Sequence, residues 1–443
     1  MKIKRFPGGL HPPEHKSTAA RAIEPCSLPD ELVIPLAQHI GAPAEPCVVI
    51  GDTVAKGQVI AQPRGFVSVP IHASSSGVVT AVEPRLHPMG RPLPAIVIKP
   101  DGRDAWPDGL EGGMNPLLVD PLTLPPSRLR DMVRNAGVVG LGGATFPTHV
   151  KLSPPGGKKI NTLILNGVEC EPYLTADHRL MLEEPERILA GIDILRRILG
   201  VERVCIGIEE NKPDAIAVMR DACAQRDIEV IALKVMYPQG AEKQLIFAVT
   251  GRQTPSGGLP MDVGVVVQNV GTAAAVADAI IHGRPLVERI ATITGPALVE
   301  PKNLRIRIGT SLRHLVAECG GLREEVVKVI MGGPMMGHTQ LSLDVPAIRG
   351  TSGLLLLDKN AVATRSEGPC IRCARCVSVC PARLLPTTIS AYARRDMIAE
   401  AERFNALDCI ECGCCAYTCP ARIPLVQSIR QVKGAILAKR RLS

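Results

Sequence analysis

The chain of 443 residues is 46% hydrophobic but only 2% aromatic, and its formal net charge at pH 7 is +8. This length predicts several domains with hydrophobic cores. Dispersed basic residues and scarce aromatic side chains exclude a nucleic-acid platform on which bases would stack. No uninterrupted apolar stretch reaches the roughly 18 residues that a membrane-spanning helix needs. The 15 cysteines follow no secretory signal, so they are predicted to lie in a reducing compartment.

The first 112 residues combine short Val/Ile stretches with frequent glycine and proline, which predicts an all-β domain. Residues 51–60 and 72–79 resemble the tight turns of a lipoyl- or biotinyl-type barrel sandwich. In those carrier proteins a lysine at a hairpin tip holds the cofactor. Here Ser74, Ser75 and Ser76 occupy the matching region, so a structural or docking role is expected.

After a predicted linker at 111–126, strand-like and helix-like patterns alternate from 120 to 283. This alternation predicts a Rossmann-like α/β domain with a mostly parallel sheet. Strands are expected at 160–166, 204–208, 230–235 and 263–268, and helices at 177–199, 213–224, 241–250 and 272–282.

The remaining chain is predicted to contain a strand-rich domain at 284–358 and a helical domain at 359–430. In the helical domain, helices are expected at 385–404 and from 425 to 438. Residues 431–443 are predicted to form a basic tail, either solvated or in contact with an anionic surface.

Two cysteine runs in the helical domain share the spacing C-x2-C-x2-C-x3-C-P, which is that of bacterial two-cluster ferredoxins. Three thiolates on such a loop bind one [4Fe–4S] cluster, and the fourth is aimed at the neighbouring cluster. One cluster is therefore assigned to Cys370, Cys373, Cys376 and Cys419, and the other to Cys409, Cys412, Cys415 and Cys380. Zinc prefers two separated C-x2-C pairs, so it is the weaker interpretation. Cys414 fits no step of the repeat and is expected to be a spare thiol.

A glycine-rich loop at 140–151 forms the second chemical signal. Glycines let backbone N–H groups approach an anion, and Lys151 can neutralise a phosphate. Beyond it, Asn166, Glu169 and Glu171 follow a predicted strand, where open α/β sheets bind ligands. A ligand with a phosphate and hydroxyls, such as flavin mononucleotide (FMN), suits this set. A bare glycine turn with helix-capping carboxylates is the alternative.

Almost the whole chain resembles the C subunit of the Rnf electron-transport complex. The segments that carry the resemblance are residues 6–14, the glycine loop 140–151, 165–172, 332–337, 350–353 and the two cysteine runs. The central part is similar to the FMN- and NADH-binding flavoprotein subunit of respiratory complex I. The resemblance also implies a soluble-ligand-binding β-grasp domain of the SLBB type after residue 284, expected to be scaffold.

The resemblance implies a role for specific residues. Gly140, Gly142, Gly143, Lys151 and Asn269 would contact the flavin, Asn166, Glu169 and Glu171 would lie around flavin and dinucleotide, and Glu242 would contact the dinucleotide. The chain departs from the complex I pattern at Thr145, where that pattern has glycine, and at His178, which is expected to be a capping or surface residue.

A nicotinamide gives two electrons as one hydride, whereas an iron–sulfur cluster accepts one electron at a time, so a flavin is needed between them. The expected path therefore runs from NADH to FMN, through two [4Fe–4S] clusters and out to another subunit. The resemblance implies a peripheral subunit on the cytoplasmic side of a bacterial inner membrane. Its partners would be the other Rnf subunits, including a ferredoxin-like iron–sulfur subunit, and the complex would translocate sodium or protons.

Three alternatives remain open from the residues. A cobalamin reductase of related domain plan would use the same flavin and clusters to reduce a corrinoid. A pure electron-transfer and docking subunit would lack the nucleotide site, as the departure at Thr145 suggests. A zinc-stabilised adaptor would hold no iron.

Overall fold

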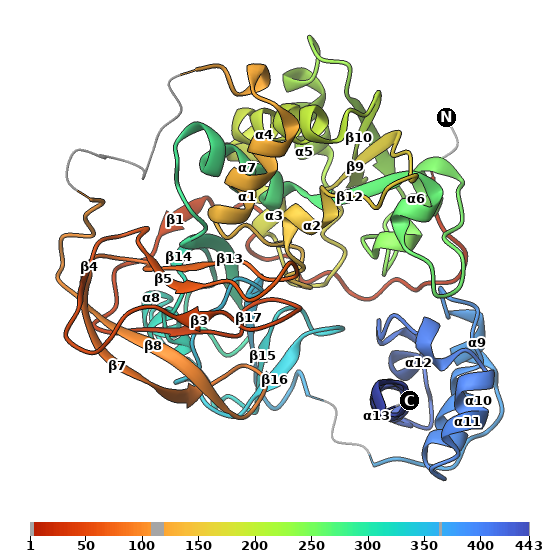
Figure 1. Cartoon of the computed structure of the whole chain (residues 1–443). Coiled ribbons are helices and arrows are strands. Elements are labelled where there is room, and N and C mark those ends of the chain that lie inside the picture. The colour runs from red at the N-terminus through yellow and green to blue at the C-terminus, as the bar shows by residue number, and fades with distance from the viewer. Residues whose placement is uncertain (1–3, 108–118, 363–365, 443) are drawn as a thin grey trace.

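A computed structural model describes residues 4–107, 119–362 and 366–442. The chain folds into four parts, with the central part at the top and the helical part, in blue, at the lower right of Figure 1, which confirms the predicted multidomain α/β class with an all-β N-terminal part. None of the helices in these ranges combines the length and the apolar character needed to cross a membrane. The predicted linker at 111–126 falls partly outside the described residues, and the 3-10 helix Pro121–Thr123 forms in its described portion.

The N-terminal barrel-sandwich part packs two antiparallel sheets around one core. The core contains Leu32, Ile34, Ile60, Ile71 and Ile96, all fully buried. One sheet has the order β2-β8-β7-β4 and the other β3-β5-β6. Their bounds are β2 Leu32–Pro35, β3 Glu45–Pro46, β4 Thr53–Val54, β5 Val59–Gln62, β6 Ile71–His72, β7 Gly77–Leu86 and β8 Pro92–Pro100.

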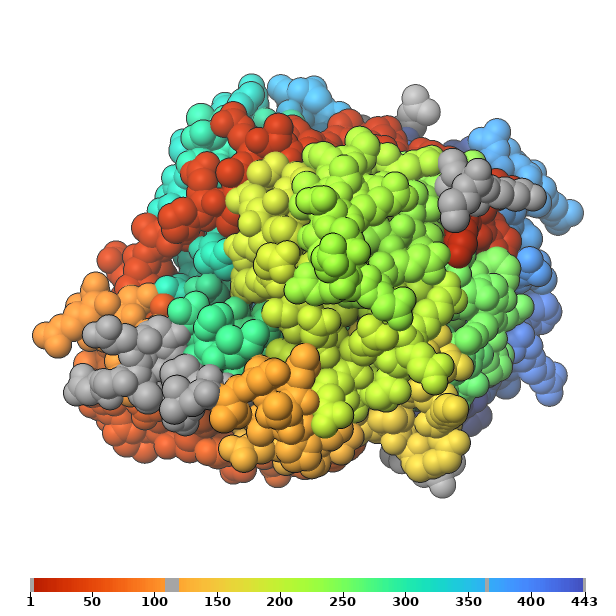
Figure 2. Space-filling model, turned by 90° about the horizontal axis from the view of Figure 1, so that it is seen from above, coloured from red at the N-terminus to blue at the C-terminus, as the bar shows by residue number. Residues whose placement is uncertain are grey.

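Only residues 32–100 of the predicted N-terminal β domain contribute to these sheets. The segment before them runs across the other parts of the molecule: Lys4 bridges to Leu233 and Leu10 to Tyr237. Strand β1 (Ile23–Pro25) then pairs with a strand of the third part. In the view from above, this N-terminal segment, in red, lies between the green central part and the cyan third part (Figure 2). Because its partners are distant in sequence, local patterns did not reveal this course.

The central part confirms the predicted alternation with a parallel sheet in the order β11-β10-β9-β12. The strands are β9 Thr162–Asn166, β10 Arg203–Glu209, β11 Glu229–Leu233 and β12 Val265–Asn269. The helices are α1 Pro126–Asn135, α2 Thr148–Lys151, α3 Ala176–Glu183, α4 Pro185–Leu199, α5 Pro213–Ala222, α6 Glu242–Thr250 and α7 Val270–Ile281, with a 3-10 turn at Pro260–Val263. The single helix expected at 177–199 was wrong, because Pro185 ends α3 and starts α4 at its first position.

The third part is a six-stranded sheet in the order β1-β14-β13-β17-β15-β16 with one helix. The added elements are β13 Glu288–Thr294, β14 Lys302–Arg307, β15 Lys328–Met331, β16 His338–Gln340, β17 Gly353–Leu357 and α8 Leu312–Glu318. Ser74 of the barrel-sandwich part donates to the carbonyl of Ile308 at 2.6 Å. This buried serine therefore contributes to docking, as expected for the region that would hold a carrier lysine.

The helical part repeats itself after 39 residues, the interval between Cys370 and Cys409. Its helices are α9 Arg375–Ser378, α10 Pro386–Ala393, α11 Ile398–Arg403, α12 Cys414–Tyr417 and α13 Leu425–Leu442, with a 3-10 turn at Ala406–Asp408. The single helix expected at 385–404 was wrong, because a turn around Asp396, with φ of +54°, separates α10 from α11. The predicted basic tail is the continuation of α13.

Helices α4 and α7 approach each other closely at a glycine. A Cβ added to Gly191 would lie 1.8 Å from the carbonyl oxygen of Ala273. We expect Gly191→Ala to lower the free energy of unfolding by about 1 to 3 kcal/mol, because the two helices must separate. Denaturant unfolding of both proteins measures the change.

The control for that substitution is Gly434→Ala, in the exposed face of α13, where an added Cβ meets nothing within 4 Å. It should raise stability by about 0.5 to 1 kcal/mol, since alanine favours helix interiors. Equal effects of the two substitutions would contradict the close packing of α4 on α7.

Candidate functional site

The sequence-predicted polar residues meet where the order of the central sheet reverses. Strand β9 continues to β10 on one side, whereas β12 lies on its other side, so the carboxyl ends of β9 and β12 flank a switch point. Asn166 and Asn269 end these strands as direct partners, and the Asn269 amide donates to the Asn166 carbonyl at 3.4 Å. The Asn269 side chain also caps α7 by accepting from the amide of Gly271 at 2.8 Å.

The glycine loop lies beside this switch point with unused donors. Gly142 faces Asn269, since an added Cβ would lie 3.5 Å from the Cβ of that residue. The amides of Gly142, Gly143 and Ala144 donate to no other described residue, whereas Gly140 donates to Phe146. Consecutive free amides of this kind form an anion-binding concavity.

Thr145 takes a left-handed backbone conformation, with φ of +49°. Such a conformation favours glycine and is strained for a β-branched residue. Thr145 therefore stands in a glycine-type position of the loop, which explains in physical terms why a related pattern has glycine there. Its methyl group fills the space beside Gly350, where an added Cβ would lie 2.9 Å from Thr145 Cγ2.

Lys151 and Glu242, which are 91 residues apart in sequence, form an ion pair at 2.6 Å. Lys151 also donates to the Val267 carbonyl of β12 at 3.2 Å. The two side chains are 28% and 36% exposed. The pair thus presents both a cation and a carboxylate to solvent beside the strand ends.

The predicted residues after β9 do not all face one ligand. Asn166 donates to the Gly240 carbonyl at 2.8 Å. Glu169 accepts from the first amides of α3, those of Asp177 at 2.7 Å and His178 at 3.1 Å. Helix capping was the alternative explanation for Glu171 and Asp177, but the carboxylate that accepts from the first amides of α3 is that of Glu169.

Glu171 lies at a junction of three parts of the molecule. Its carboxylate accepts from the amides of Met335 at 3.1 Å and Met336 at 2.8 Å, which belong to the third part. The Tyr237 hydroxyl is 3.5 Å away. Burial raises the pKa of Glu171 to about 7, although the two amides partly stabilise its charge.

Two further residues lie in this region, Asp177, which was considered only as a helix cap, and Lys16, which was not predicted. Asp177 accepts from the Asn269 amide at 2.6 Å, and burial followed by the charge of Glu169 raises its pKa to about 7. Lys16 donates to the carbonyls of Glu169, Glu171 and Leu174 at 2.9, 3.2 and 2.6 Å. Lys16 therefore orders the loop that carries the acidic residues. No short motif could signal a contact spanning more than 150 residues.

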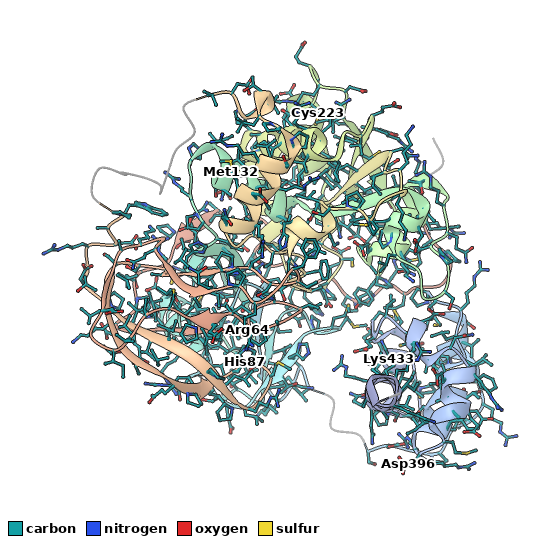
Figure 3. The ribbon with its side chains drawn as sticks, viewed as in Figure 1. Arg64, His87, Met132, Cys223, Asp396 and Lys433 are labelled. Atoms are coloured by element: carbon teal, nitrogen blue, oxygen red, sulfur yellow. The ribbon has the colours of Figure 1, made fainter. Side chains whose placement is uncertain are left out.

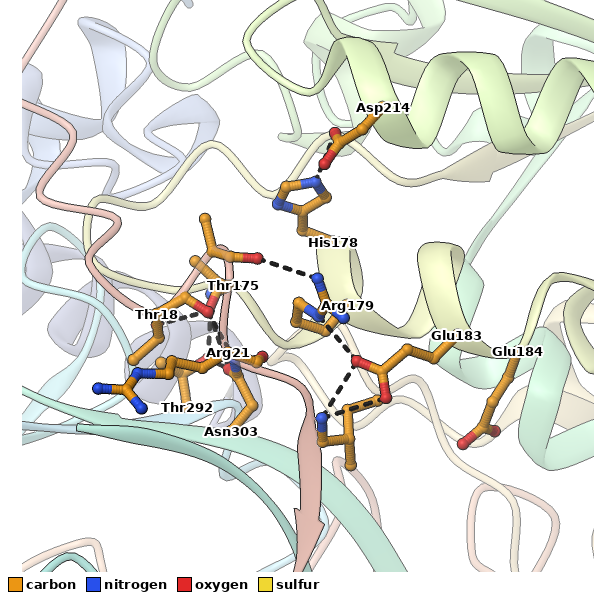
Figure 4. Close-up of polar contacts among 12 residues, drawn as sticks. Thr18, Arg21, Thr175, His178, Arg179, Glu183, Glu184, Asp214, Thr292 and Asn303 are labelled. Carbon is orange, nitrogen blue, oxygen red and sulfur yellow. Dashed lines mark hydrogen bonds and ion pairs between the residues drawn. The ribbon is translucent and has the colours of Figure 1, made fainter. Parts of the chain in front are cut away.

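His178 was expected to be a capping or surface residue, and this expectation was wrong. Its side chain is buried, and its Nε2 lies 2.8 Å from Asp214 at the start of α5 (Figure 4). The next residue, Arg179, donates to the carbonyl of Ala19. Helix α3 thereby binds α5 within the central part through His178, and binds the N-terminal segment through Arg179.

In the helical part, four cysteines from both runs surround one cavity of about 190 Å³. They are Cys370, Cys373, Cys376 and Cys419, the set assigned to one cluster from the spacing. Cys370 and Cys373 are exposed. The amide of Arg372 donates to the sulfur of Cys370 at 3.4 Å. Amide-to-sulfur bonds of this type stabilise cluster thiolates.

The other four cysteines, Cys380, Cys409, Cys412 and Cys415, also lie close together. Burial, followed by the neighbouring charges of the other three, raises the pKa of Cys415, and burial raises that of Cys409 to about 11. The amide of Glu411 donates to Cys409 Sγ at 3.4 Å, in the same place of the repeat as Arg372. Lys433 of α13 (Figure 3) donates to the Cys409 carbonyl at 2.6 Å. Bound iron would relieve the repulsion among the four thiolates, two of which are buried and two partly buried.

Tyr237 connects this second cysteine set with the central part. Its hydroxyl donates to the carbonyl of Cys412 at 2.8 Å. Cys414, predicted to be a spare thiol, is fully buried and lies 3.8 Å from the Tyr237 carbonyl. Cys170 accepts from the amide of Gly240 at 3.3 Å in the same cluster of side chains. The second set therefore adjoins the central part through Tyr237, whereas two cysteines of the first set, Cys370 and Cys373, are exposed.

A separate cavity of about 700 Å³ lies behind the glycine loop, between α4, α7 and β13. It is lined in part by Leu141, Asp177 and Gly271, but not by Lys151, Asn166 or Glu242. The residues predicted from sequence to bind the cofactors therefore lie near the strand ends and do not line this cavity.

Four family models match successive regions of the chain. They are the RnfC barrel sandwich hybrid domain at residues 4–103, the Nuo51 FMN-binding domain at 133–278, the SLBB domain at 290–339 and the 4Fe-4S dicluster domain at 363–420. These matches confirm the predicted kinds of domain.

Full-length relatives decide the family. The C subunit of the proton-translocating ferredoxin:NAD(+) oxidoreductase complex of Clostridium ljungdahlii is 50% identical, covering 97% of this chain and 94% of the relative. The C subunit of the Na(+)-translocating complex of Acetobacterium woodii is 49% identical, covering 100% and 99%. The chain belongs to the RnfC family, the C subunits of Rnf complexes.

Another RnfC protein, from the ion-translocating oxidoreductase complex of Pseudomonas aeruginosa, is 46% identical over 99% of this chain, which spans 56% of that longer relative. Among solved structures, an NAD+-reducing [NiFe]-hydrogenase in the H2-reduced state is similar with a TM-score of 0.50 and 19% identity, over 73% of this chain and 67% of that one. This second likeness concerns the fold alone.

The raised pKa of Glu171 predicts how stability depends on pH. Between the ordinary carboxyl pKa of 4.5 and about 7, the folded state binds a proton that the unfolded state releases. This contribution to stability is present at low pH and is lost as the pH rises through about 7. We expect Glu171→Gln to flatten the decline in unfolding free energy between pH 5 and 8, measured by urea unfolding at each pH.

Glu210 is exposed and provides the control for this substitution. Glu210→Gln should leave the pH dependence of stability as it is in the parent protein. If the unfolding free energy of Glu171→Gln declined with pH as steeply as that of the parent protein and of Glu210→Gln, the Glu171 carboxyl would not be the group that titrates.

Proposed function

We propose that this chain is the peripheral, NAD(H)-facing electron-transfer subunit of a membrane-bound, ion-translocating ferredoxin:NAD oxidoreductase complex of the Rnf type. The observation that carries the proposal is the contact made by Tyr237. Its hydroxyl donates to the Cys412 carbonyl in the second cysteine set, and three residues further on Gly240 accepts from Asn166, at the strand end beside which the glycine loop lies. The names of the full-length relatives agree with this assignment.

The residues at the switch point fit FMN. The free amides of Gly142, Gly143 and Ala144, with Lys151, would hold its phosphate and ring oxygens, and Asn166 and Asn269 would order the strand ends beneath it. When bound, FMN accepts a hydride and passes electrons on singly. Gly140 supports the loop by its bond to Phe146 rather than by an open amide.

The nicotinamide cofactor would use the open side of the site. Glu242 is partly exposed and paired with Lys151, so it can accept hydrogen bonds from ribose or amide groups at the rim. Glu169 and Glu171 are occupied by backbone amides. We therefore assign dinucleotide contact to Glu242, and assign loop order and docking to Glu169 and Glu171.

The cysteines fit two [4Fe–4S] clusters. Both runs have left-handed residues at equivalent places, namely Arg372 and Glu411, Ala374 and Gly413, and Arg383 and Arg422. Identical backbone turns in the two runs support identical cluster ligation, with one cysteine exchanged between the runs. A structural zinc site would need neither the third cysteine of each run nor this exchange.

The arrangement supports an order for the two clusters. Cys412 adjoins Tyr237 and the central part, so the cluster of Cys380, Cys409, Cys412 and Cys415 would be next to the flavin. The cluster of Cys370, Cys373, Cys376 and Cys419 would follow, because two of its ligands are exposed. Electrons would leave there to another subunit, which we propose is a ferredoxin-like iron–sulfur protein on the cytoplasmic side of the inner membrane.

Anaerobic purification tests this function. We expect about eight irons and eight sulfides per chain, as two cubane clusters require, together with FMN at close to one equivalent. NADH should then reduce both clusters, observed by EPR. Colourless, iron-free protein would support the zinc adaptor. Clusters that dithionite reduces but NADH does not would support a pure electron-transfer subunit, and rapid reduction of an added corrinoid would favour a cobalamin reductase.

The proposed order of the clusters predicts the effect of Cys376→Ala, which removes a buried cysteine of the first set, the one that would hold the outer cluster. We expect loss of about half of the iron, unchanged FMN content, and an inner cluster that NADH still reduces. EPR and iron analysis measure these quantities. Cys47→Ser, at an exposed thiol of the barrel-sandwich part, is the control. Failure of NADH to reduce the remaining cluster would reverse the order.

A further inference from the structure

Arg289 lies behind the glycine loop on β13 of the third part, and only 6% of it is exposed. All of its hydrogen bonds go to backbone carbonyls. Nε donates to Ile290 at 3.2 Å, Nη2 donates to Leu141 at 3.3 Å, and Nη1 donates to Arg349. A guanidinium therefore reaches from one folded part into the glycine loop of another.

The contact with Leu141 controls the direction of the next amide. The Leu141 N–H donates to Thr272 Oγ1 at 2.9 Å, and its carbonyl accepts from Arg289, so the residue is held from both sides. In a planar trans peptide the carbonyl of one residue and the N–H of the next point in opposite directions. When Arg289 holds the Leu141 carbonyl, the amide of Gly142 is turned away from Arg289. This is one of the amides without a protein acceptor among the described residues.

Arg289 also brings a positive charge that no carboxylate neutralises at contact distance. Among the described residues it forms no ion pair, and Asp177 is the acidic group that acts on it from farther away. Burial lowers the pKa of Arg289 to about 10, so the side chain stays protonated at neutral pH. A buried cation behind free amides strengthens the attraction of the loop for an anion.

We propose that Arg289 is a positioning residue for the flavin phosphate, acting through the Leu141 peptide and through its buried charge. The inference rests on the proposed FMN site. It extends that site into the third part of the molecule, which the sequence presented as scaffold. Because the effect is directed at the phosphate, Arg289 should matter for FMN and not for riboflavin, which has the same ring without the phosphate.

The test compares the affinities of flavin-depleted protein, with its clusters intact, for FMN and riboflavin by fluorescence titration. We expect Arg289→Gln to weaken FMN binding by about 10-fold or more, the size typical for losing a charged hydrogen-bond partner. Riboflavin binding should change less than about 2-fold. Riboflavin affinity and iron content show that the variant is folded.

Arg349 offers a matched control, because it is a 1% exposed arginine of the same part whose side chain donates to the Pro70 carbonyl and not to the glycine loop. The substitution keeps its backbone carbonyl, which accepts from Arg289. Arg349→Gln should lower stability without changing the ratio of FMN to riboflavin affinity. If Arg289→Gln does not fold, Arg289→Lys provides the test. Lysine keeps the charge but cannot bridge the carbonyls of Leu141 and Arg349 as the guanidinium does. It should weaken FMN binding several-fold, again selectively.

An unchanged ratio of FMN to riboflavin affinity in the folded Arg289 variants would overturn the role of Arg289. If the parent protein prefers FMN, that result would leave the proposed function standing. If the parent protein binds neither flavin, the FMN site itself would be wrong, and this inference would fall with it.

Discussion

The hydrogen bond from the Tyr237 hydroxyl to the Cys412 carbonyl is the contact that joins the central part to the second cysteine set. Tyr237 is fully enclosed, and its backbone exchanges two hydrogen bonds with Leu10 of the N-terminal segment. Three residues further on, Gly240 accepts from Asn166 at the strand end. A short stretch of chain, residues 237–240, thus connects the end of β9 to the second cysteine set.

Around this contact, residues of the different folded parts are in direct contact with one another. Glu171 from the central part binds two amides of the third part, and Gly413 in the second cysteine run leaves room for the carbonyl of Met335. The N-terminal segment completes the junction, since Gly9 donates to the carbonyl of Val379 beside the first run. Small residues occur where backbones meet, because a Cβ would keep them apart.

Ionisable side chains with shifted pKa values lie both at the switch point and in the second cysteine set. At the switch point, the half-buried carboxyls of Glu171 and Asp177, which have raised pKa values, lie near two cations, the half-buried Lys16 and the buried Arg289. In the second cysteine set, burial raises the pKa of most of the thiols, which must lose their protons to bind iron. Both regions are therefore arranged for charged cofactors rather than for a neutral core.

Local patterns determined much of this protein. The alternation of apolar segments predicted the parallel sheet, and the repeated C-x2-C-x2-C-x3-C-P spacing predicted the four thiols that surround one cavity, because this spacing sets which cysteine each run contributes to the other. Prolines and left-handed turns shortened two predicted helices, at Pro185 and near Asp396. Only the tertiary structure revealed that Glu169 caps a helix, that Glu171 serves a junction, and that Lys16 and Arg289 donate to carbonyls of the loops that carry the predicted site residues. Their partners are distant in the chain, and such contacts arise from packing between parts, which no local spacing encodes.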